Sequence, residues 1–138
     1  MVRQEQFTVV TAGHKDIHDI TTQVTSIVRG SGIKTGIAHV FVEGSTGAIG
    51  LMECETGLKQ DLPRVLDGLI PPSPDYKHEA TWSDGNGHSH LQATLLGQSV
   101  TIPVTDGGPL LGTWQQVFLL ECDIKPRKRT VVVTVIGE

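Results

Sequence analysis

The sequence predicts an α+β fold in which an antiparallel β-sandwich is flanked by two helices. Strand-like runs outnumber helical patterns, and several of the runs are joined by links short enough for hairpins. Aromatic residues make up only 4% of the 138 residues, so we expect a core of Val, Ile and Leu, which suits strands. The length is that of one domain, and residues 1–138 are therefore expected to form a single unit.

The N-terminal part predicts a strand followed by a helix. Residues 5–12 have strand composition and stop at Gly13. Asp16 is a suitable N-cap for a helix that ends at Gly30 and Gly32. The apolar positions of this helix recur every three or four residues and are Ile17, Ile20, Val24, Ile27 and Val28.

Two further strands and a second helix follow. Residues 35–43 and 47–54 are strand-like, and Gly44-Ser45-Thr46 between them predicts a hairpin or a tight corner. Thr56 is expected to cap a helix that Pro71-Pro72-Ser73-Pro74 ends. Its apolar side is formed by Leu58, Leu62, Val65, Leu66 and Leu69, and Pro63 either kinks it or opens its main section.

The C-terminal half predicts four more strands, separated by glycine and proline turns. They lie near residues 90–96, 99–104, 115–122 and 129–136. The last of them is β-branched nearly throughout, so we expect it to be buried on both faces.

Composition excludes several classes of protein. The formal net charge of −4 offers no general attraction to nucleic acid or to a membrane surface. The N-terminus lacks the apolar core of a signal peptide, and no run approaches the roughly 20 apolar residues that span a bilayer. A cytoplasmic protein is expected. Cys54 and Cys122 stand alone, which favours two buried thiols and leaves one disulfide open.

The segment from Ser83 to His90, with His78 upstream, concentrates side chains able to bind a metal or a phosphate ester. If a strand begins at His88, then His88 and His90 share one face, and with His78 they can hold one divalent metal, zinc or magnesium. The same imidazoles, with Asn86, are the candidate catalytic groups. The alternative is an ordinary loop whose histidines bond to backbone or water.

Other candidate sites have equally plain alternatives. In Gly44-Ser45-Thr46-Gly47 the hydroxyls and N–H groups can hold a phosphate oxygen, or they can satisfy their own turn. Glu53 and Glu55 can be ligands or bases, or a solvated strand edge. Trp114 can line a pocket, although a core or subunit anchor is the favoured reading. The basic cluster Lys125, Arg127, Lys128 and Arg129 can bind phosphate or form a solvated turn.

The order of these motifs resembles the YjbQ-like family, which is sometimes labelled secondary thiamine-phosphate synthase. The resemblance spans nearly the whole chain. It includes the basic stretch before the last strand and is carried by Tyr76-Lys77-His78, Asp84-Gly85-Asn86-Gly87-His88-Ser89-His90-Leu91, Leu95-Leu96-Gly97, Ile102-Pro103-Val104 and Leu111-Gly112-Thr113-Trp114-Gln115-Gln116.

The resemblance implies a compact α+β fold, a homotrimer and a site near subunit boundaries where the motif histidines gather. His78, Asn86 and His90 match the family's motif positions, and His88 falls where many relatives carry aspartate. Gly44 replaces a histidine that many members carry, so any base or ligand set that used that histidine is absent, and Glu53 or His88 would need to compensate.

The expected function is a thiamine-phosphate-synthase-like enzyme that acts on a small phosphorylated metabolite. His78, His88 and His90 hold a divalent metal or act as acid and base, while Asn86 and Thr46 orient the substrate. The substrate-binding set is Ser45, Thr46, Glu53, Thr113, Gln115, Arg127 and Arg129. The rival function is a metal- or metabolite-binding trimer without turnover, in which protein ligands fill every metal position.

Overall fold

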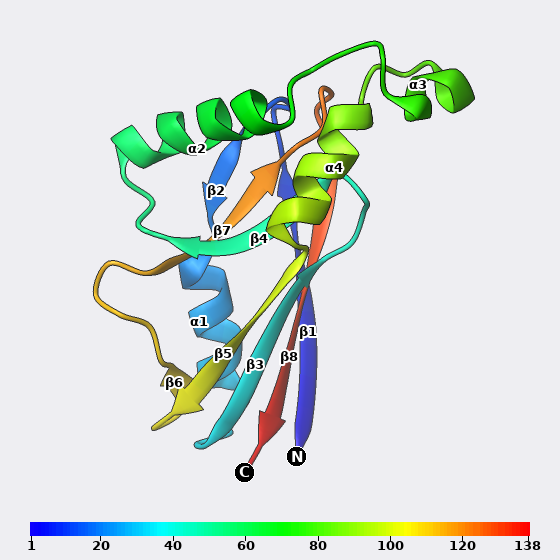
Figure 1. The fold of residues 1–138 in the computed structure, drawn as a ribbon. Helices are drawn as coiled ribbons and strands as arrows, with labels where there is room; N and C mark the ends of the chain where they lie inside the picture. The colour runs from blue at the N-terminus through cyan, green and yellow to red at the C-terminus, as the bar shows by residue number, and fades with distance from the viewer.

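The computed structural model describes residues 1–138, whose strands form two antiparallel sheets. The large sheet has the order β1-β8-β3-β5-β6, and both chain ends lie at the same end of it (Figure 1). The Met1 ammonium donates to the Gly137 carbonyl at 2.8 Å. The strands are β1 (Val2–Val10), β3 (Gly36–Val42), β5 (Ser99–Thr105), β6 (Gly108–Pro109) and β8 (Lys128–Gly137).

Strand β8 lies between β1 and β3, but only one of its faces is fully buried. Val131, Val133 and Val135 point into the core, because successive side chains of a strand face opposite sides. On the other face Val132 is half-buried and Ile136 is exposed. The expectation that this strand is buried on both faces is therefore wrong for the single chain.

The small sheet has the order β2-β7-β4 and is covered on both sides. Val117 and Leu119 of β7 join the main core with the large sheet, whereas Phe118 and Leu120 pack in a second core beneath two helices. This double coverage explains why β7 is an almost uninterrupted apolar run. The strands are β2 (Ile17–Asp19), β4 (Gly47–Met52) and β7 (Gln116–Glu121).

The α+β class and the two sheets are as predicted, but there are four helices instead of two. They are α1 (Thr21–Gly30), α2 (Thr56–Leu69), α3 (Lys77–Trp82) and α4 (Gly87–Leu96). The first begins later than predicted because residues 17–19 pair with β7 as β2. Glu55, and not Thr56, caps α2 by accepting from the Gly57 and Leu58 N–H groups, and Pro63 lies within this unbroken helix.

The predicted strand at residues 90–96 is wrong, because these residues belong to α4. Ser89, Gln92 and Ala93 are spaced by three and four and are buried against the small sheet and α2. Leu91 and Leu95 point outward and are exposed. A short apolar run does not by itself distinguish a buried strand from a helix.

The link between β3 and β4 is a corner, because these strands belong to different sheets. It lies beside the link between β7 and β8, where the Cys122 N–H donates to the Thr46 carbonyl at 2.9 Å. The two links meet near α3 and α4, at the end of the molecule opposite the termini (Figure 1).

Both cysteines are free, with Cys122 buried and Cys54 half-buried. None of the helices is both long enough and apolar enough to cross a membrane.

Candidate functional site

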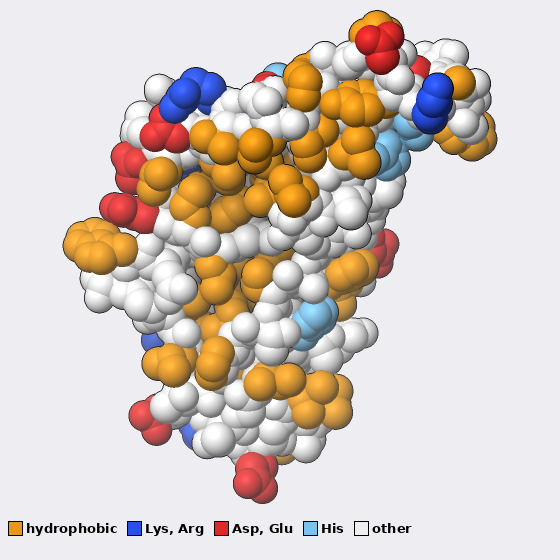
Figure 2. Space-filling view, in the orientation of Figure 1, with side chains coloured by type: hydrophobic (Ala, Val, Ile, Leu, Met, Phe, Trp, Pro, Cys, Tyr) orange, Lys and Arg blue, Asp and Glu red, His pale blue; other side chains and the backbone are white.

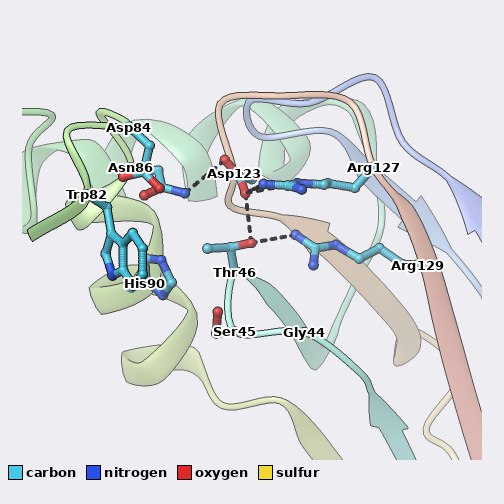
Figure 3. A pocket seen from close by; sticks show the side chains of 10 residues that line it. All are labelled: Gly44, Ser45, Thr46, Trp82, Asp84, Asn86, His90, Asp123, Arg127 and Arg129. Atoms are coloured by element: carbon cyan, nitrogen blue, oxygen red, sulfur yellow. Dashed lines mark hydrogen bonds and ion pairs between the residues drawn. The ribbon is translucent and has the colours of Figure 1, made fainter. Parts of the chain in front are cut away.

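A cavity of about 370 Å³ opens where the two links meet the loop between α3 and α4 (Figure 3). Its wall is polar apart from one tryptophan. The lining residues are Gly44, Ser45, Thr46, Trp82, Asp84, Asn86, His90, Asp123, Arg127 and Arg129. Segments far apart in the sequence therefore bring hydroxyls, carboxylates, an imidazole and two guanidinium groups to one place.

Arg129 is held in a buried ion pair. Its Nε donates to Oε1 of Glu121 at 2.8 Å, and its Nη2 donates to Oε2 of Glu121 and to the Thr46 hydroxyl. The Glu121 carboxylate also accepts from the Thr11 hydroxyl at 2.7 Å. These contacts fix the guanidinium rigidly, while its Nη1 makes no hydrogen bond within the chain.

Arg127 is held in the same way but is open to solvent. Its Nε and Nη2 donate to Oδ2 of Asp123 at 3.1 and 2.7 Å. Burial acts to raise the pKa of Asp123, but hydrogen bonds from Arg127, Thr46 and the Ile124 N–H outweigh it, so this pKa lies below its ordinary value. The carboxylate thus remains charged, and Nη1 of Arg127 is also unpartnered.

His90 and His78 lie against each other, with ring centroids 4.4 Å apart. Burial lowers the pKa of His90 below its ordinary value, and the neighbouring His78 lowers it further. His90 is therefore neutral near pH 7 and able to accept a proton.

The carboxamide of Asn86 lies between His78 and Asp123. One end is 2.9 Å from Nε2 of His78, and the other is 3.4 Å from Oδ1 of Asp123. Turned end for end, the amide donates to His78 and to Asp84 at 2.9 and 2.8 Å. Asn86 can therefore bond to Nε2 of His78 whether or not that nitrogen carries a hydrogen. Oδ1 of Asp84 lies 3.1 Å from the same nitrogen.

His88 faces the other side of α4 and does not join this site. Helix positions two apart point about 200° from each other, whereas the same positions on a strand would share a face. His88 is buried, its ring centroid lies 6.5 Å from that of His14, and neither ring nitrogen has a hydrogen-bond partner. No group of three or more His, Cys, Asp or Glu side chains could hold a metal ion. The residues present do not fit the predicted three-histidine metal site.

Most of the other predicted site residues converge. Ser45, Thr46, Asn86, His90, Arg127 and Arg129 line the cavity, with His78 directly behind Asn86.

Three predicted substrate-binding residues lie outside the cavity. Glu53 is exposed beyond the end of β4, while Thr113 and Gln115 occupy an exposed turn before β7. In that turn Oε1 of Gln115 accepts from the Gly112 N–H. Trp114 is 71% exposed, so the expectation of a core anchor is wrong within one chain.

Four lining residues were not among the predicted site residues: Gly44, Trp82, Asp84 and Asp123. A signal for Asp123 exists in the sequence. Glu121 and Asp123 are carboxylates two apart at the end of an apolar strand, just before a basic cluster, and unpaired buried carboxylates are costly.

The backbone and the neighbouring Arg129 explain why residue 44 is a glycine. Its φ of +110° favours glycine, and a Cβ there would collide with Nη1 of Arg129. The histidine that many members of the resembled family carry does not fit beside Arg129 in this arrangement, and neither Glu53 nor His88 reaches the cavity to replace it.

Comparison with known proteins gives concordant matches. Residues 5–138 match the family described as UPF0047 protein YjbQ-like. The chain is 40% identical over 137 residues to a UPF0047 protein of Methanothermobacter thermautotrophicus, covering 99% of this chain and 94% of the relative. A crystal structure of a YbjQ-like protein of unknown function from Sulfolobus solfataricus is 41% identical with a TM-score of 0.94, covering 100% and 99% of the two chains. A hypothetical protein from Aeropyrum pernix is 34% identical with a TM-score of 0.90, covering 99% of each.

Proposed function

Because the chain belongs to the UPF0047 family of YjbQ-like proteins, we propose that it is an enzyme that acts on a small phosphorylated metabolite in the cavity described above. One observation carries this proposal. Two rigidly held guanidinium groups, each with an unpartnered Nη1, line the same cavity as His90. Guanidinium groups match phosphate oxygens in geometry and charge, and a neutral imidazole supplies acid–base chemistry.

The phosphate is expected between the arginines and the corner after β3. Ser45 and Thr46 line this side of the cavity, and the Ser45 hydroxyl donates to no group of the chain. Hydroxyls and backbone N–H groups of a glycine-flanked turn complement an anion. His90, on α4, lies across from them (Figure 3).

Charge at the cavity is nearly balanced. Arg127 and Arg129 lie beside Asp84 and Asp123 in the wall, and Glu121 is buried behind Arg129. With His90 neutral, these five side chains carry a formal charge of −1. A bound phosphate therefore relies on directed hydrogen bonds and favours protonation of His90. Phosphate binding is expected to take up protons and to strengthen as the pH falls from 8 to 6.

The reaction we propose is similar to thiamine-phosphate synthesis, in which a pyrimidine pyrophosphate joins a thiazole phosphate. Departure of pyrophosphate requires that its developing charge be stabilised. Arg127 and Arg129 are our candidates for this role, and His90 is our candidate for moving a proton, because all three line the same cavity. The rival function, metabolite binding without turnover, uses the same arginines and leaves His90 without a chemical task.

We also propose that the functional unit is a homotrimer. Apolar side chains gather over α2, α4 and the small sheet (Figure 2), where they border a groove of about 460 Å³. Leu69 of α2 and Leu95 of α4 are exposed, as are Leu110 and Trp114. A monomer rarely leaves so much contiguous apolar surface in water, and a second copy of the chain would cover it.

The test of function is calorimetric titration of thiamine monophosphate and of inorganic phosphate, with a coupled assay of thiamine-phosphate formation. Arg127→Ala should weaken binding about 10-fold or more, because one charge-assisted contact contributes about 1.5–3 kcal/mol. Lys128→Ala is the matched control, since it removes the same charge from an exposed neighbour outside the cavity. Equal effects of the two variants would contradict the phosphate site; binding without turnover would favour the rival function.

A further inference from the structure

Trp82 is the only hydrophobic residue that lines the cavity, and its side chain is poorly explained by the fold. It is 70% exposed and belongs to neither hydrophobic core. The aromatic contacts of the chain join histidine rings, and none involves the indole. A large apolar ring left in water beside a polar cavity is typical of a binding surface.

Hydrogen bonds fix the backbone around Trp82. Helix α3 ends at Ser83, which has a φ of +56° and bonds through its N–H and hydroxyl to the Glu79 carbonyl. The Glu79 carboxylate accepts from the N–H groups of Gly85 and Gly87 at 2.7 and 2.8 Å. The turn that leads from Trp82 to Asn86 and His90 is therefore fixed to α3, and the indole is presented on the same support as the imidazole.

We propose that Trp82 is a specificity-determining residue that stacks on a planar ring of the ligand, whose phosphate is held by Arg127. This inference rests on the proposed function and narrows it to ring-bearing phosphate esters. In Figure 3 the indole and His90 lie on one side of the cavity, and both arginines lie on the other, with Thr46 between them. A ligand that spans the cavity thus has an aromatic end and an anionic end.

Two properties of the cavity fit such a ligand. Its volume of about 370 Å³ lies at the small end of the range of ligand pockets, about 300–1,000 Å³, which suits one or two rings with a phosphate. Every other lining residue is polar or glycine, so an aliphatic ligand would find no apolar surface other than the indole. A flat ring uses that surface best, because the π faces of two rings pack in an offset stack.

The experiment compares affinities for phosphates with and without a ring. Thiamine monophosphate, pyridoxine 5′-phosphate and adenosine 5′-monophosphate are titrated against glycerol 3-phosphate, by calorimetry, with the full-length protein. Trp82→Ala should weaken the best-bound ring-bearing phosphate about 10-fold or more while changing the affinity for glycerol 3-phosphate less than about 2-fold. Trp82→Phe is the matched control, since it keeps an aromatic ring at the same position and should retain most of the affinity.

A second measurement reads the indole directly. Trp82 and Trp114 are the only tryptophans, so Trp114→Phe leaves Trp82 as the sole indole emitter. Its fluorescence should change on addition of the best-bound ring-bearing phosphate and remain unchanged with glycerol 3-phosphate. Stacking fails if both kinds of ligand lose affinity equally in Trp82→Ala, if no ring-bearing phosphate binds better than glycerol 3-phosphate, or if the emission does not respond. The affinity of Arg127→Ala for glycerol 3-phosphate separates failure of stacking from failure of the proposed function. If Arg127 binds the phosphate, this variant binds glycerol 3-phosphate more weakly whether or not Trp82 stacks on a ring. If the cavity is not a phosphate site, the variant binds glycerol 3-phosphate as the unchanged protein does.

Discussion

Replacement of Arg129 by methionine tests how much the buried ion pair of Arg129 and Glu121 stabilises the protein. Arg129→Met keeps the apolar stem of the side chain but removes the only cation that contacts the Glu121 carboxylate. That carboxylate is fully buried and would keep only the hydrogen bonds from the Thr11 hydroxyl, at 2.7 Å, and from the Asp123 N–H, at 3.1 Å. An uncompensated charge would then remain in the interior.

Removal of one partner of a buried ion pair costs about 3–5 kcal/mol. The free energy of unfolding of a domain is about 5–15 kcal/mol, so Arg129→Met should lose about a fifth of it or more. With a urea dependence near 2 kcal/mol per molar, the unfolding midpoint at pH 7 should fall by about 2 M.

The control removes both charges. Glu121→Gln/Arg129→Met leaves a neutral amide that can still accept from Thr11, so it should recover at least about 2 kcal/mol relative to Arg129→Met. Urea unfolding followed by circular dichroism measures both variants. A loss below about 1 kcal/mol in the single variant, or a double variant no more stable than the single, would refute the buried-pair reasoning.

The remaining predictions concern three side chains. His90→Ala should abolish turnover in the thiamine-phosphate assay while shifting the urea midpoint little, since the ring lies at a cavity edge; a large loss of stability with full activity would make His90 structural. Because the pKa of His90 is lowered in the ligand-free protein, kcat/KM should be constant above pH about 6.5 and fall only below it, as a pH–rate profile would show. Burial, and to a smaller extent the charge of Lys15, lowers the pKa of His88, so the unfolded chain binds more protons than the folded one as the pH falls. The free energy of unfolding should therefore be fully retained above pH about 6.5 and decline below it. His88→Leu should flatten that decline in urea titrations at pH 5 to 8. Trp114→Ala should cost about 3–5 kcal/mol only if another copy buries the exposed ring; light scattering should give about 45 kDa for the trimer, three times 14.9 kDa, and a single-chain mass would reject it.

Six of the eight strands and two of the four helices could be predicted from composition and spacing, whereas the short strands β2 and β6 were not. The β-branched composition of β8 predicts a strand, although not which of its faces is buried, and the three-to-four spacing in α2 reflects burial of one face of that helix. Helix α4 could not be recognised in this way. Its buried side includes His88, Ser89 and Gln92, while Leu91 and Leu95 are exposed, so burial there runs against hydrophobicity. Gln92 is buried because its amide donates to Asp67 and to the Ile70 carbonyl, partners that the sequence does not identify.

The prediction of a strand where α4 lies also led to the wrong grouping of histidines. On a strand, His88 would share a face with His90. On the helix, His88 instead lies near the charges of Lys15 and Asp67. The side of the cavity formed by Ser45, Thr46 and Arg127 was easier to predict, because hydroxyls in a glycine-flanked turn and a basic cluster beside a strand are recognisable in the sequence as candidate anion sites. The place of Trp82 depends on where α3 lies in space, which no periodicity reports, whereas the carboxylates Glu121 and Asp123 just before the basic cluster were a usable signal.

A crystal structure of the protein soaked with saturating thiamine monophosphate would show directly whether the cavity binds a phosphate and a ring together. Phosphate density is expected within hydrogen-bond distance of Nη1 of Arg127 and of the Ser45 hydroxyl, with a ring of the ligand against Trp82; the Thr46 hydroxyl already donates to Asp123. Density for the ligand at another surface, or an empty cavity under conditions where calorimetry shows saturation, would contradict this expectation.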